Sequence, residues 1–406
     1  MIVNDNEAVK KIAPSKNLTR EQLNLKKEIL AFCEKQHNCD RKRIFIVEGN
    51  AGTGKSLVMS SLFSQLQKKV KVQKESGLYN TKNYLLVNHP EMLKLYKNVA
   101  GTDHYLLKKE FERPTTFINR MEKEGKTADI VLIDEAHLLL TKKDRYNHFE
   151  HDNQLEEIIK YSRVIILVFD VNQVLKGKSL WTSKRLAQIT KSCDVQIFKL
   201  TAQFRVQAEP DVKKWLTAFT NKMIMPFPHK QKFDFRIVDN AQQMYTLIKK
   251  HDREVGLSRL LATYDYPYRL DGKDYFVTAG NLRIRWDRSK PTEKLPWAER
   301  KDTVAEVGSV YTIQGFDLNY AGVILGPSVS YDEQRNCLLL RPEFYEDQAA
   351  FNGLKQQADS TEKLQKFKEQ VMLNAMYVLL TRARKGLYIF AADEKLRTKL
   401  MKLKTI

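Results

Sequence analysis

Cysteine and long apolar runs are both scarce in this sequence. Its 406 residues include four cysteines, Cys33, Cys39, Cys193 and Cys337, which form no CxxC pair. Neither a disulfide framework nor a zinc knuckle is therefore indicated. The longest apolar run, VIILVF at residues 164–169, is far too short to cross a bilayer, and the polar first residues contain no export signal. With no tandem repeat and no low-complexity tract either, we expect a soluble, cytoplasmic protein with no membrane partner.

Acidic residues are also few relative to basic ones. Lys and Arg total 69 against 49 Asp and Glu, which gives a formal net charge of +20 at pH 7. This excess favours a polyanionic partner or an acidic membrane surface, and nucleic acid is the commoner choice. Hydrophobic residues make up 42% and aromatic residues 10%, which suffices for packed cores. The chain is too long for one small core, so we expect two or three globular domains.

Short apolar runs alternate with helical patterns along the chain, which predicts an α/β fold with parallel strands. We expect strands at residues 43–49, 84–88, 129–134, 164–170 and 195–200 in the first half. In the second half we expect them at residues 233–238, 258–263, 308–313, 321–326 and 386–392. Two prolines and a basic run at residues 221–232 predict a linker between a lobe at 1–220 and a lobe at 233–406. Residues 265–300 and 328–370 have the composition of insertions on the second lobe.

A glycine-rich turn, GNAGTGKS at residues 49–56, follows the first predicted strand and precedes a helical pattern. It matches GxxxxGK(S/T), the turn whose backbone N–H groups hold the phosphates of ATP at the start of a helix. Lys55 would reach the outer phosphates, and Ser56 would hold Mg²⁺. The residues of this predicted phosphate turn are Gly49, Asn50, Ala51, Gly52, Thr53, Gly54, Lys55 and Ser56.

Two carboxylates follow the predicted strand in DIVLIDEAH. Asp134 would bind the metal ion together with Ser56, and Glu135 would accept a proton from the attacking water. The pair implies hydrolysis of the nucleotide rather than binding alone. His137 either couples the site to a neighbouring loop or caps local structure.

Two other segments are less specific. In LTREQ, Gln22 either completes a capping box with Thr19 or reads the adenine edge. The segment KKDRYNHFEHDN at residues 142–153 contains acids and histidines without the spacing of a tetrahedral zinc site. We interpret it as a solvated loop.

Taken together, these ordered motifs resemble those of superfamily 1 helicases, most closely the bacterial and phage proteins with a Schlafen group 3-like helicase domain. The resemblance covers residues 18–393. It implies two RecA-like P-loop lobes, each a mainly parallel sheet flanked by helices. ATP and Mg²⁺ would bind in the cleft between the lobes, and the protein would be of bacterial or phage origin.

The resemblance gives roles to residues of the first lobe. Gln22 would read adenine. In VFDVNQ, Asp170 and Gln173 would sense the terminal phosphate and transmit its presence to the residues that hold a bound strand. Arg205, in LTAQFRVQ, would lie near the same phosphate.

The second lobe would complete the site. In LLTRARKG, Arg382 is at the arginine-finger position, and Arg384 and Lys385 are weaker candidates. The segment TIQGFD, in which the family usually has Glu at the last position, would contact the nucleotide through Gln314, Gly315 and Asp317. Because the two lobes would share the site, hydrolysis would be coupled to lobe closure.

Strand-binding residues are expected in both lobes. By resemblance, those of the first lobe are Asn88, His89, Thr115, Thr116 and Phe117. In the second lobe, YDYPYR and NLRIRWDRSK interleave aromatic residues with cations, and the candidates are Tyr266, Tyr268, Arg269, Arg283, Arg285 and Trp286. Rings stack on unpaired bases for about 1 to 3 kcal/mol each, although aromatic residues at strand spacing are more often core residues. Single-stranded DNA or RNA is therefore the expected partner rather than a duplex.

Several activities share these motifs. We favour a nucleic-acid-dependent ATPase, either a helicase or a single-strand translocase. An ATP-gated nucleic-acid-binding subunit of a larger complex, for example in phage defence, would close without processive unwinding. A superfamily 2 remodeller, suggested by DEAH, is disfavoured because MYVLLTRARKG replaces its usual QxxGRxxR-like segment. A kinase or protein-remodelling ATPase would hydrolyse ATP regardless of nucleic acid.

Overall fold

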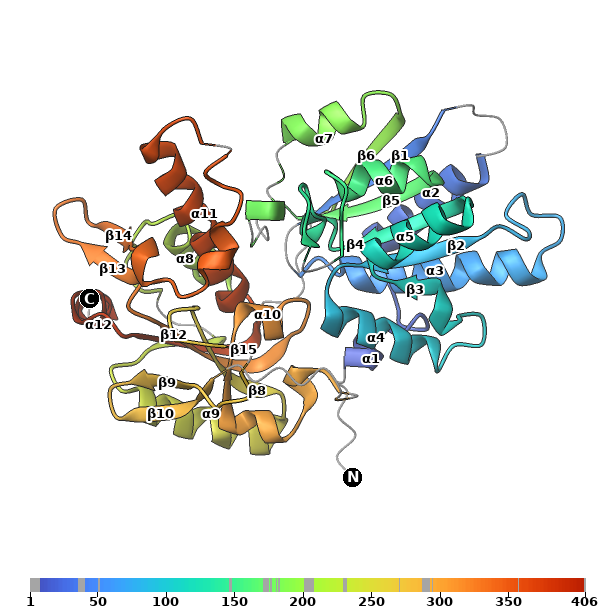
Figure 1. Cartoon of the computed structure of the whole chain (residues 1–406). Coiled ribbons are helices and arrows are strands. Elements are labelled where there is room, and N and C mark those ends of the chain that lie inside the picture. Colours follow the sequence, from blue (N-terminus) through green and yellow to red (C-terminus); the bar gives the residue numbers. More distant parts are fainter. Residues whose placement is uncertain are drawn as a thin grey trace. The chain divides into compact units, whose positions relative to one another are not determined.

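Two compact units make up the chain in the computed structural model (Figure 1). Unit 1 comprises Met1–Val174 and Lys178–Phe204, and unit 2 comprises Leu175–Gly177 and Arg205–Ile406. Helix α8 (Pro210–Phe219), which the sequence analysis placed in the first lobe, thus belongs to unit 2. The structure describes residues 8–35, 41–49, 52–145, 148–170, 175, 177–179, 181, 183–200, 208–228, 232–269, 271–286, 293, 295–356 and 358–404.

Unit 1 contains a six-stranded parallel sheet with the order β3-β2-β4-β5-β1-β6. Its strands are β1 (Arg43–Gly49), β2 (Asn83–Val87), β3 (Phe111–Glu112), β4 (Ala128–Asp134), β5 (Ser162–Phe169) and β6 (Asp194–Leu200). The five strands predicted in the first half are confirmed within one or two residues, and the two-residue strand β3 is an addition. Burial of every residue after the second in β4 and β5 explains the apolar runs in their sequences.

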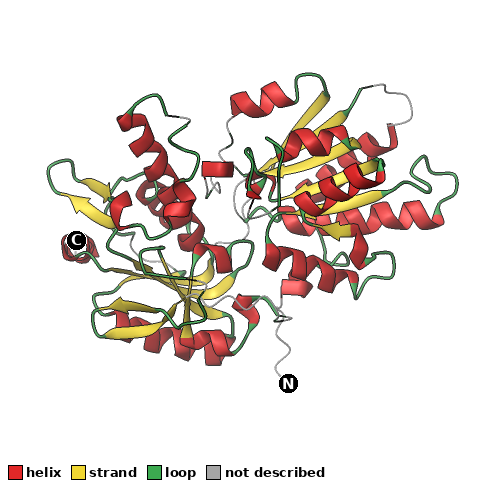
Figure 2. Ribbon diagram, in the orientation of Figure 1, coloured by secondary structure: helices red, strands yellow, loops and turns green. Residues whose placement is uncertain are grey.

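Helices cover both faces of this sheet (Figure 2). They are α1 (Ala8–Lys11), α2 (Arg20–Glu34), α3 (Lys55–Val72), α4 (Pro90–Ala100), α5 (Pro114–Glu124), α6 (Gln154–Lys160) and α7 (Ser183–Ile189). On one face Phe32 of α2 contacts Phe45 of β1, with ring centroids 5.3 Å apart. Side chains alternate along a strand, so Ile44 and Ile46 point to the other face, where they join a core cluster with Ile118 of α5.

Unit 2 contains a seven-stranded sheet with the order β7-β15-β12-β8-β11-β10-β9 and a separate β13–β14 hairpin. The strands are β7 (Asp234–Ile237), β8 (Ser258–Ala262), β9 (Phe276–Ala279), β10 (Leu282–Trp286), β11 (Glu306–Gly308), β12 (Leu318–Leu325), β13 (Val329–Asp332), β14 (Cys337–Leu340) and β15 (Ala383–Ala391). Within the large sheet, the β9–β10 pair is antiparallel and the other pairs are parallel. Besides α8, its helices are α9 (Ala241–Val255), α10 (Val310–Ile313), α11 (Thr361–Leu380) and α12 (Glu394–Lys404). The predicted α/β class, with mainly parallel sheets flanked by helices, is confirmed.

One predicted strand is wrong. Residues 308–313 do not form a strand, because β11 ends at Gly308 and Val310–Ile313 is the short helix α10. Ser309 explains the change, since its hydroxyl accepts the N–H of Tyr311 at 3.1 Å and so caps a helix start. The β-branched and aromatic residues of this run are typical of strands, so the sequence alone predicted a strand there.

The two predicted insertions have regular structure. Residues 276–286 form the β9–β10 hairpin, and β10 pairs in parallel with β11, so this segment extends the main sheet. Inward-facing Val277, Ile284 and Trp286 are buried in its core. Because arginines alternate with the buried residues of β10, the sequence was interpreted as an insertion rather than as a strand of the main sheet. The second segment contains β13, β14 and the first half of α11.

The carboxyl edge of the unit 1 sheet brings three chain segments together. Strand β5 lies between β1 and β4, and all three run in the same direction. Gly49, Asp134 and Asp170 therefore lie at the same edge of the sheet, where ligands of open α/β sheets bind.

Candidate active site

The phosphate turn joins β1 to α3 through two glycines in the left-handed region. Gly52 has a φ of 87° and Gly54, the N-cap residue of α3, has a φ of 79°. Side-chain-bearing residues rarely adopt these angles, which is why the motif needs glycine there. Space is also limited, because a Cβ on Gly54 would lie 2.3 Å from Gln22 Nε2. Asn50 and Ala51 lie outside the described residues.

Lys55 is buried at the first position of α3. Its Nζ lies 2.5 Å from the carbonyl oxygen of Gly49 and 3.5 Å from Oδ2 of Asp170. The lysine therefore links the end of β1 to the residue that follows β5. The structure brings together two residues, Lys55 and Asp170, that the sequence analysis placed near the terminal phosphate.

Asp134 is fully buried at the end of β4. Its carboxylate accepts hydrogen bonds from the hydroxyl of Tyr96 at 2.7 Å and from the N–H of Glu135 at 3.0 Å, and the Ser56 hydroxyl also bonds to it. Burial raises the pKa of Asp134, and the neighbouring charge of Glu135 raises it further, while the bonds from Tyr96 and Ser56 act in the opposite direction. Two carboxylates thus adjoin each other in a buried position.

Glu135 has a backbone conformation that is uncommon for a residue with a side chain. Its φ is 52°, in the left-handed region, and it precedes the 3-10 turn η3 (Ala136–Leu138). Such conformations are found preferentially at functional sites. Its Oε2 lies 3.0 Å from Nε2 of buried His137. Burial alone would raise the pKa of Glu135, but the contact with His137 and the charges of His137 and Lys55 outweigh it and lower the pKa to about 2.

Ser56 and Asp134 fit a magnesium ion. A hydroxyl and a carboxylate in contact supply the hard oxygen ligands that Mg²⁺ takes, and a divalent cation would offset the repulsion between Asp134 and Glu135. Within the described part of the chain, no group of three or more His, Cys, Asp and Glu side chains is arranged to hold a metal ion. The histidine-containing segment at 142–153 instead makes ion pairs, with His151 Nε2 3.3 Å from Glu122 Oε2.

Gln22 is bonded at both ends of its side-chain amide. Its Oε1 accepts the N–H of Thr19 at 3.0 Å, and the Thr19 hydroxyl accepts the N–H of Gln22 at 3.3 Å, which confirms the capping box. Its Nε2 donates to the carbonyl oxygen of Thr53 in the phosphate turn at 3.1 Å. Each end of the amide has one further hydrogen-bonding position, so these two bonds do not decide whether Gln22 contacts adenine. In this structure Gln22 ties α2 to the phosphate turn.

The two predicted nucleotide motifs of unit 2 lie side by side. Asp317 precedes β12 and Arg382 precedes β15, and the N–H of Leu318 donates to the carbonyl oxygen of Arg382 at 2.9 Å. Gly315 has a φ of 86°, so the turn between α10 and β12 requires glycine there. Gln314, which ends α10, is buried.

Arg382 is fully buried. Its Nε donates to the carbonyl oxygen of Val378 at 2.7 Å, and its Nη2 lies 3.5 Å from the Thr381 hydroxyl. Buried guanidinium groups require such partners because desolvation of the charge is costly. These bonds hold the side chain at the end of α11. Its role as an arginine finger stays a prediction, as do the roles of Gln173 and Arg205, which lie outside the described residues.

The predicted strand-binding residues of unit 1 are mostly engaged in internal packing. The Asn88 side chain donates to the carbonyl oxygen of Leu138 at 2.8 Å, and His89 caps α4 by accepting the N–H of Met92 at 3.3 Å. The Thr115 hydroxyl accepts a bond from Gln154 at 2.9 Å. Thr116 is exposed. Phe117 is fully buried in the core cluster, so its ring offers no face for base stacking.

The aromatic candidates of unit 2 are also core residues. Tyr266 and Trp286 are buried, with ring centroids 5.9 Å apart, which corrects their predicted role as stacking platforms. Their alternation with cations follows from strand geometry, because successive side chains point to opposite faces. Tyr268 is half-buried against Tyr275.

The cations of the same segments are more accessible. Arg269 and Arg283 are exposed, and the guanidinium of Arg283 lies 3.6 Å from the ring centroid of Phe276. Arg285 is half-buried and pairs with Asp274 at 3.0 Å. Arg269 and Arg283 therefore remain the better candidates for phosphate contacts.

Tyr96 is a site residue that sequence reasoning missed. It lies on the buried face of α4 with Met92, Leu95 and Val99, where an apolar residue would pack equally well. A hydroxyl on an otherwise apolar helix face was the available signal. Which carboxylate it meets depends on how α4 packs against β4, and the local sequence does not encode that contact.

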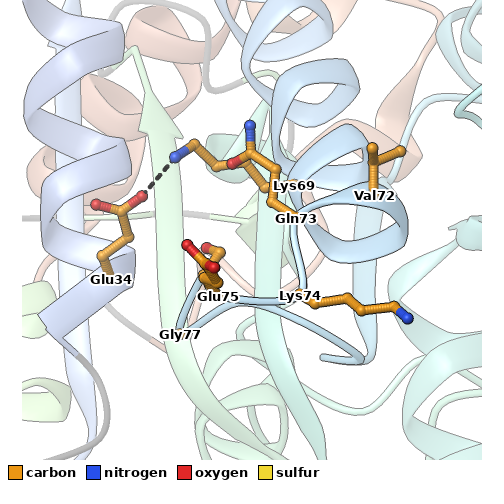
Figure 3. Close-up of a pocket in the computed structure, with 8 residues that line it drawn as sticks. Glu34, Lys69, Val72, Gln73, Lys74, Glu75 and Gly77 are labelled. Atoms are coloured by element: carbon orange, nitrogen blue, oxygen red, sulfur yellow. Dashed lines mark hydrogen bonds and ion pairs between the residues drawn. The ribbon is translucent and has the colours of Figure 1, made fainter.

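A surface hollow lies at the far end of α3 from the phosphate turn (Figure 3). Since α3 has 18 residues, the two ends are about 25 Å apart. Glu34 of α2 and Lys69 of α3 point toward each other there, with Oε1 and Nζ 2.8 Å apart. The other lining residues are Val72, Gln73, Lys74, Glu75, Ser76 and Gly77. Acidic and basic side chains both line the hollow, so it does not have the uniformly basic lining that would favour a phosphate.

Similar proteins were found by sequence and by structure. The uncharacterized protein YPL245W of Saccharomyces cerevisiae is 41% identical over 415 residues, covering 95% of this chain and 90% of the yeast protein. This comparison does not support the bacterial or phage origin that we expected. Among the described residues, no helix combines the length and the apolar character needed to cross a membrane.

Two solved structures show low overall similarity. The Pif1 helicase from Candida albicans has a TM-score of 0.38 and 11% identity, over 95% of this chain and 97% of that chain. AMPPCP-bound DnaA from Aquifex aeolicus has a TM-score of 0.27 and 15% identity, over 47% of this chain and 50% of that chain. At these scores neither structure supports an assignment of function.

The family comparison covers most of the chain. Residues 42–393 match the model of the Schlafen group 3 DNA/RNA helicase domain. This range includes Lys55, Asp134, Glu135 and Arg382. The chain therefore belongs to the Schlafen group 3 DNA/RNA helicase domain family.

Proposed function

We propose that this protein is a nucleic-acid-dependent ATPase that couples ATP hydrolysis to closure of its two lobes and to movement on, or remodelling of, DNA or RNA. One observation carries the proposal. In a chain of a DNA/RNA helicase domain family, Lys55, Asp170, Ser56, Asp134 and Glu135 gather at one edge of a parallel sheet, next to a glycine turn that starts a helix.

The residues of unit 1 have distinct roles in this proposal. The N–H groups at the start of α3 and the ammonium of Lys55 bind the phosphates. Ser56 and Asp134 hold Mg²⁺, which neutralises charge on the transferred phosphoryl group when it is bound. Glu135, whose pKa of about 2 keeps it ionised at neutral pH, accepts the proton of the attacking water. Asp170 and Gln173 sense the terminal phosphate.

Residues of both lobes complete the proposed reaction centre. Arg382 supplies positive charge to the transition state, Arg205 lies near the terminal phosphate, and Gln314, Gly315 and Asp317 contact the nucleotide. An arginine supplied in this way accounts for about 10³-fold or more in rate in related phosphoryl-transfer enzymes. Hydrolysis would then require closure, which is how a motor couples chemistry to movement.

The proposed polymer is a single strand of DNA or RNA. The net charge of +20 favours a polyanion, and exposed Arg269 and Arg283 are available for phosphate contacts. Because such contacts release counterions, affinity should fall with salt at a log-log slope of about −0.7 per phosphate neutralised. A flat response would contradict electrostatic binding.

The decisive experiment measures ATP turnover with and without single-stranded DNA, single-stranded RNA and duplexes, with Lys55→Ala as the control for contaminating activity. We expect stimulation by a single strand. Turnover that ignores nucleic acid would contradict the proposal and favour a kinase or a protein-remodelling ATPase. Displacement of a labelled strand then distinguishes movement from an ATP-gated clamp, which would be stimulated without displacing it.

A further inference from the structure

The strand β6 is an edge of the unit 1 sheet with one partner. It pairs in parallel with β1 over seven residues, and no other described strand pairs with it (Figure 1). The opposite edge, β3, has two residues and is followed by Arg113 and Pro114. Proteins commonly protect sheet edges by short strands, prolines or charges. β6, with the sequence DVQIFKL, has no proline and is the longer edge.

The backbone groups of three of the seven residues of β6 point away from the sheet. The N–H of Asp194 donates to the carbonyl oxygen of Lys42 at 2.9 Å, so this residue faces β1. Backbone direction alternates along a strand, so the N–H and C=O groups of Val195, Ile197 and Lys199 point outward. No described residue bonds to these outward groups. They form a ladder of three donors and three acceptors, spaced to fit an extended chain.

The outward edge also has an apolar side-chain row. Val195 is 36% exposed and Ile197 is 55% exposed. In register they pair with Ile44 and Ile46, which belong to the buried core cluster on that face of the sheet. The apolar face of the sheet therefore continues past its helices into solvent at β6, which is typical of an interaction site.

We propose that β6 is a docking edge at which an extended segment of a partner protein adds a further strand to the sheet. The segment would carry apolar side chains at alternate positions, over Val195 and Ile197, and acidic side chains between them. The acidic character follows from the net charge of +20, which attracts an anionic partner. This proposal is independent of ATP hydrolysis.

A second copy of the chain fits the edge less well. Two copies each carry +20 and repel one another. A contact through β6 alone would be about 23 Å long and about 10 Å wide, roughly 230 Å² per copy, whereas a stable interface buries about 800 Å² per partner.

The test uses the full chain and a fluorescent heptapeptide of alternating valine and glutamate, with binding followed by anisotropy. Ile197→Pro removes an outward N–H and leaves the bonds to β1 intact, so it should weaken binding at least tenfold. Ile197→Val keeps both the N–H and the apolar surface and should bind like the parent. A heptapeptide of alternating valine and lysine, and one with the valines and glutamates in blocks, should each bind at least tenfold more weakly.

N-methylated peptides test the ladder without changing the protein, and they decide the question if Ile197→Pro does not fold. Methylation of one alternating set of peptide nitrogens should abolish binding, and methylation of the other set should not. Equal loss with both sets, no loss with either, or equal binding of the blocked peptide would overturn the proposal. It would also be overturned by light scattering that shows a dimer dissolved by Ile197→Pro, since the second copy would then be the occupant.

Discussion

Two buried aspartates, one in each unit, follow parallel strands, and burial raises the pKa of both, but their neighbouring groups differ. Asp134 follows the apolar run of β4 and has a second carboxylate, Glu135, beside it. Asp265 lies just beyond β8, and among the described groups no second carboxylate raises its pKa; the positive charge of Arg341 lowers its pKa against the effect of burial. Burial of a carboxylate therefore does not by itself indicate a catalytic site. A like charge next to the buried one, with hydroxyl groups around it, indicates a place for a cation.

The bonds around Asp265 explain why we interpret it as structural. Its carboxylate accepts the Thr263 hydroxyl at 3.0 Å, the N–H of Ser328 at 3.0 Å and the Ser328 hydroxyl at 2.7 Å. The Thr263 hydroxyl in turn accepts the N–H of Gly326 at 2.8 Å. These bonds join the ends of β8 and β12. Donors from the protein saturate this carboxylate, and no basic nitrogen of a phosphate turn is near it.

The largest expected effect concerns the phosphate turn. Lys55→Ala should reduce ATP turnover by about 10³-fold or more, because the ammonium acts directly on the transferred phosphates. The matched control is Lys69→Ala, which removes a lysine from the other end of the same helix. Steady-state turnover checks both variants. Parent-like activity of Lys55→Ala would show that the site is misassigned.

Alanine substitutions at the two aspartates should affect different properties, stability for Asp265 and turnover for Asp134. Asp265→Ala leaves three donors without their acceptor and should lower the free energy of unfolding by about 3 kcal/mol. Asp134→Ala should lose turnover, while its free energy of unfolding changes by less than about 1 kcal/mol, because repulsion from Glu135 is removed with the carboxylate. Urea unfolding and turnover at a temperature where both variants are folded test this. The contrast between the two aspartates would be contradicted if Asp134→Ala were less stable than Asp265→Ala.

The pH dependence of the free energy of unfolding should test the raised pKa of Asp265 in unit 2. Burial raises the pKa of Asp265 from 3.8 to about 6, so the folded state binds this proton more tightly than the unfolded state does. The stability that this proton contributes is present below pH 4 and is lost as the pH rises through 6, a change of about 3 kcal/mol in total. Relative to Asp265→Asn, the parent should therefore lose stability between pH 4 and 6. A constant difference across this window would contradict the raised pKa.

The smallest effect is expected at Tyr96. Tyr96→Phe removes the hydroxyl that donates to Asp134 and keeps the packed ring, so the free energy of unfolding should change by about 1 kcal/mol. Affinity for Mg²⁺ should fall about tenfold, because partners that orient a metal ligand affect metal binding. Binding of a fluorescent nucleotide, titrated with Mg²⁺, measures this. Unchanged Mg²⁺ dependence would mean that Tyr96 only packs.

Local patterns predicted most of the strands and the glycine turn that starts α3, because unbroken apolar runs and glycines with a fixed spacing report local geometry. They failed at residues 308–313, where the hydroxyl of Ser309 caps a helix inside an apparent strand. They also failed for Trp286 and Phe117, since the burial of a ring depends on which elements pack over it. The contact between Tyr96 and Asp134 depends on tertiary packing in the same way.

Helices α2 and α3 are joined at three levels along their length. Gln22 bonds to the phosphate turn at 3.1 Å, Lys26 bonds to the Ser61 hydroxyl at 2.8 Å, and Glu34 pairs with Lys69 at 2.8 Å. Glu28 of α2 also lies 3.5 Å from Gln196 of β6. Helix α2 therefore contacts both the phosphate turn and the edge strand at which we propose that a peptide docks.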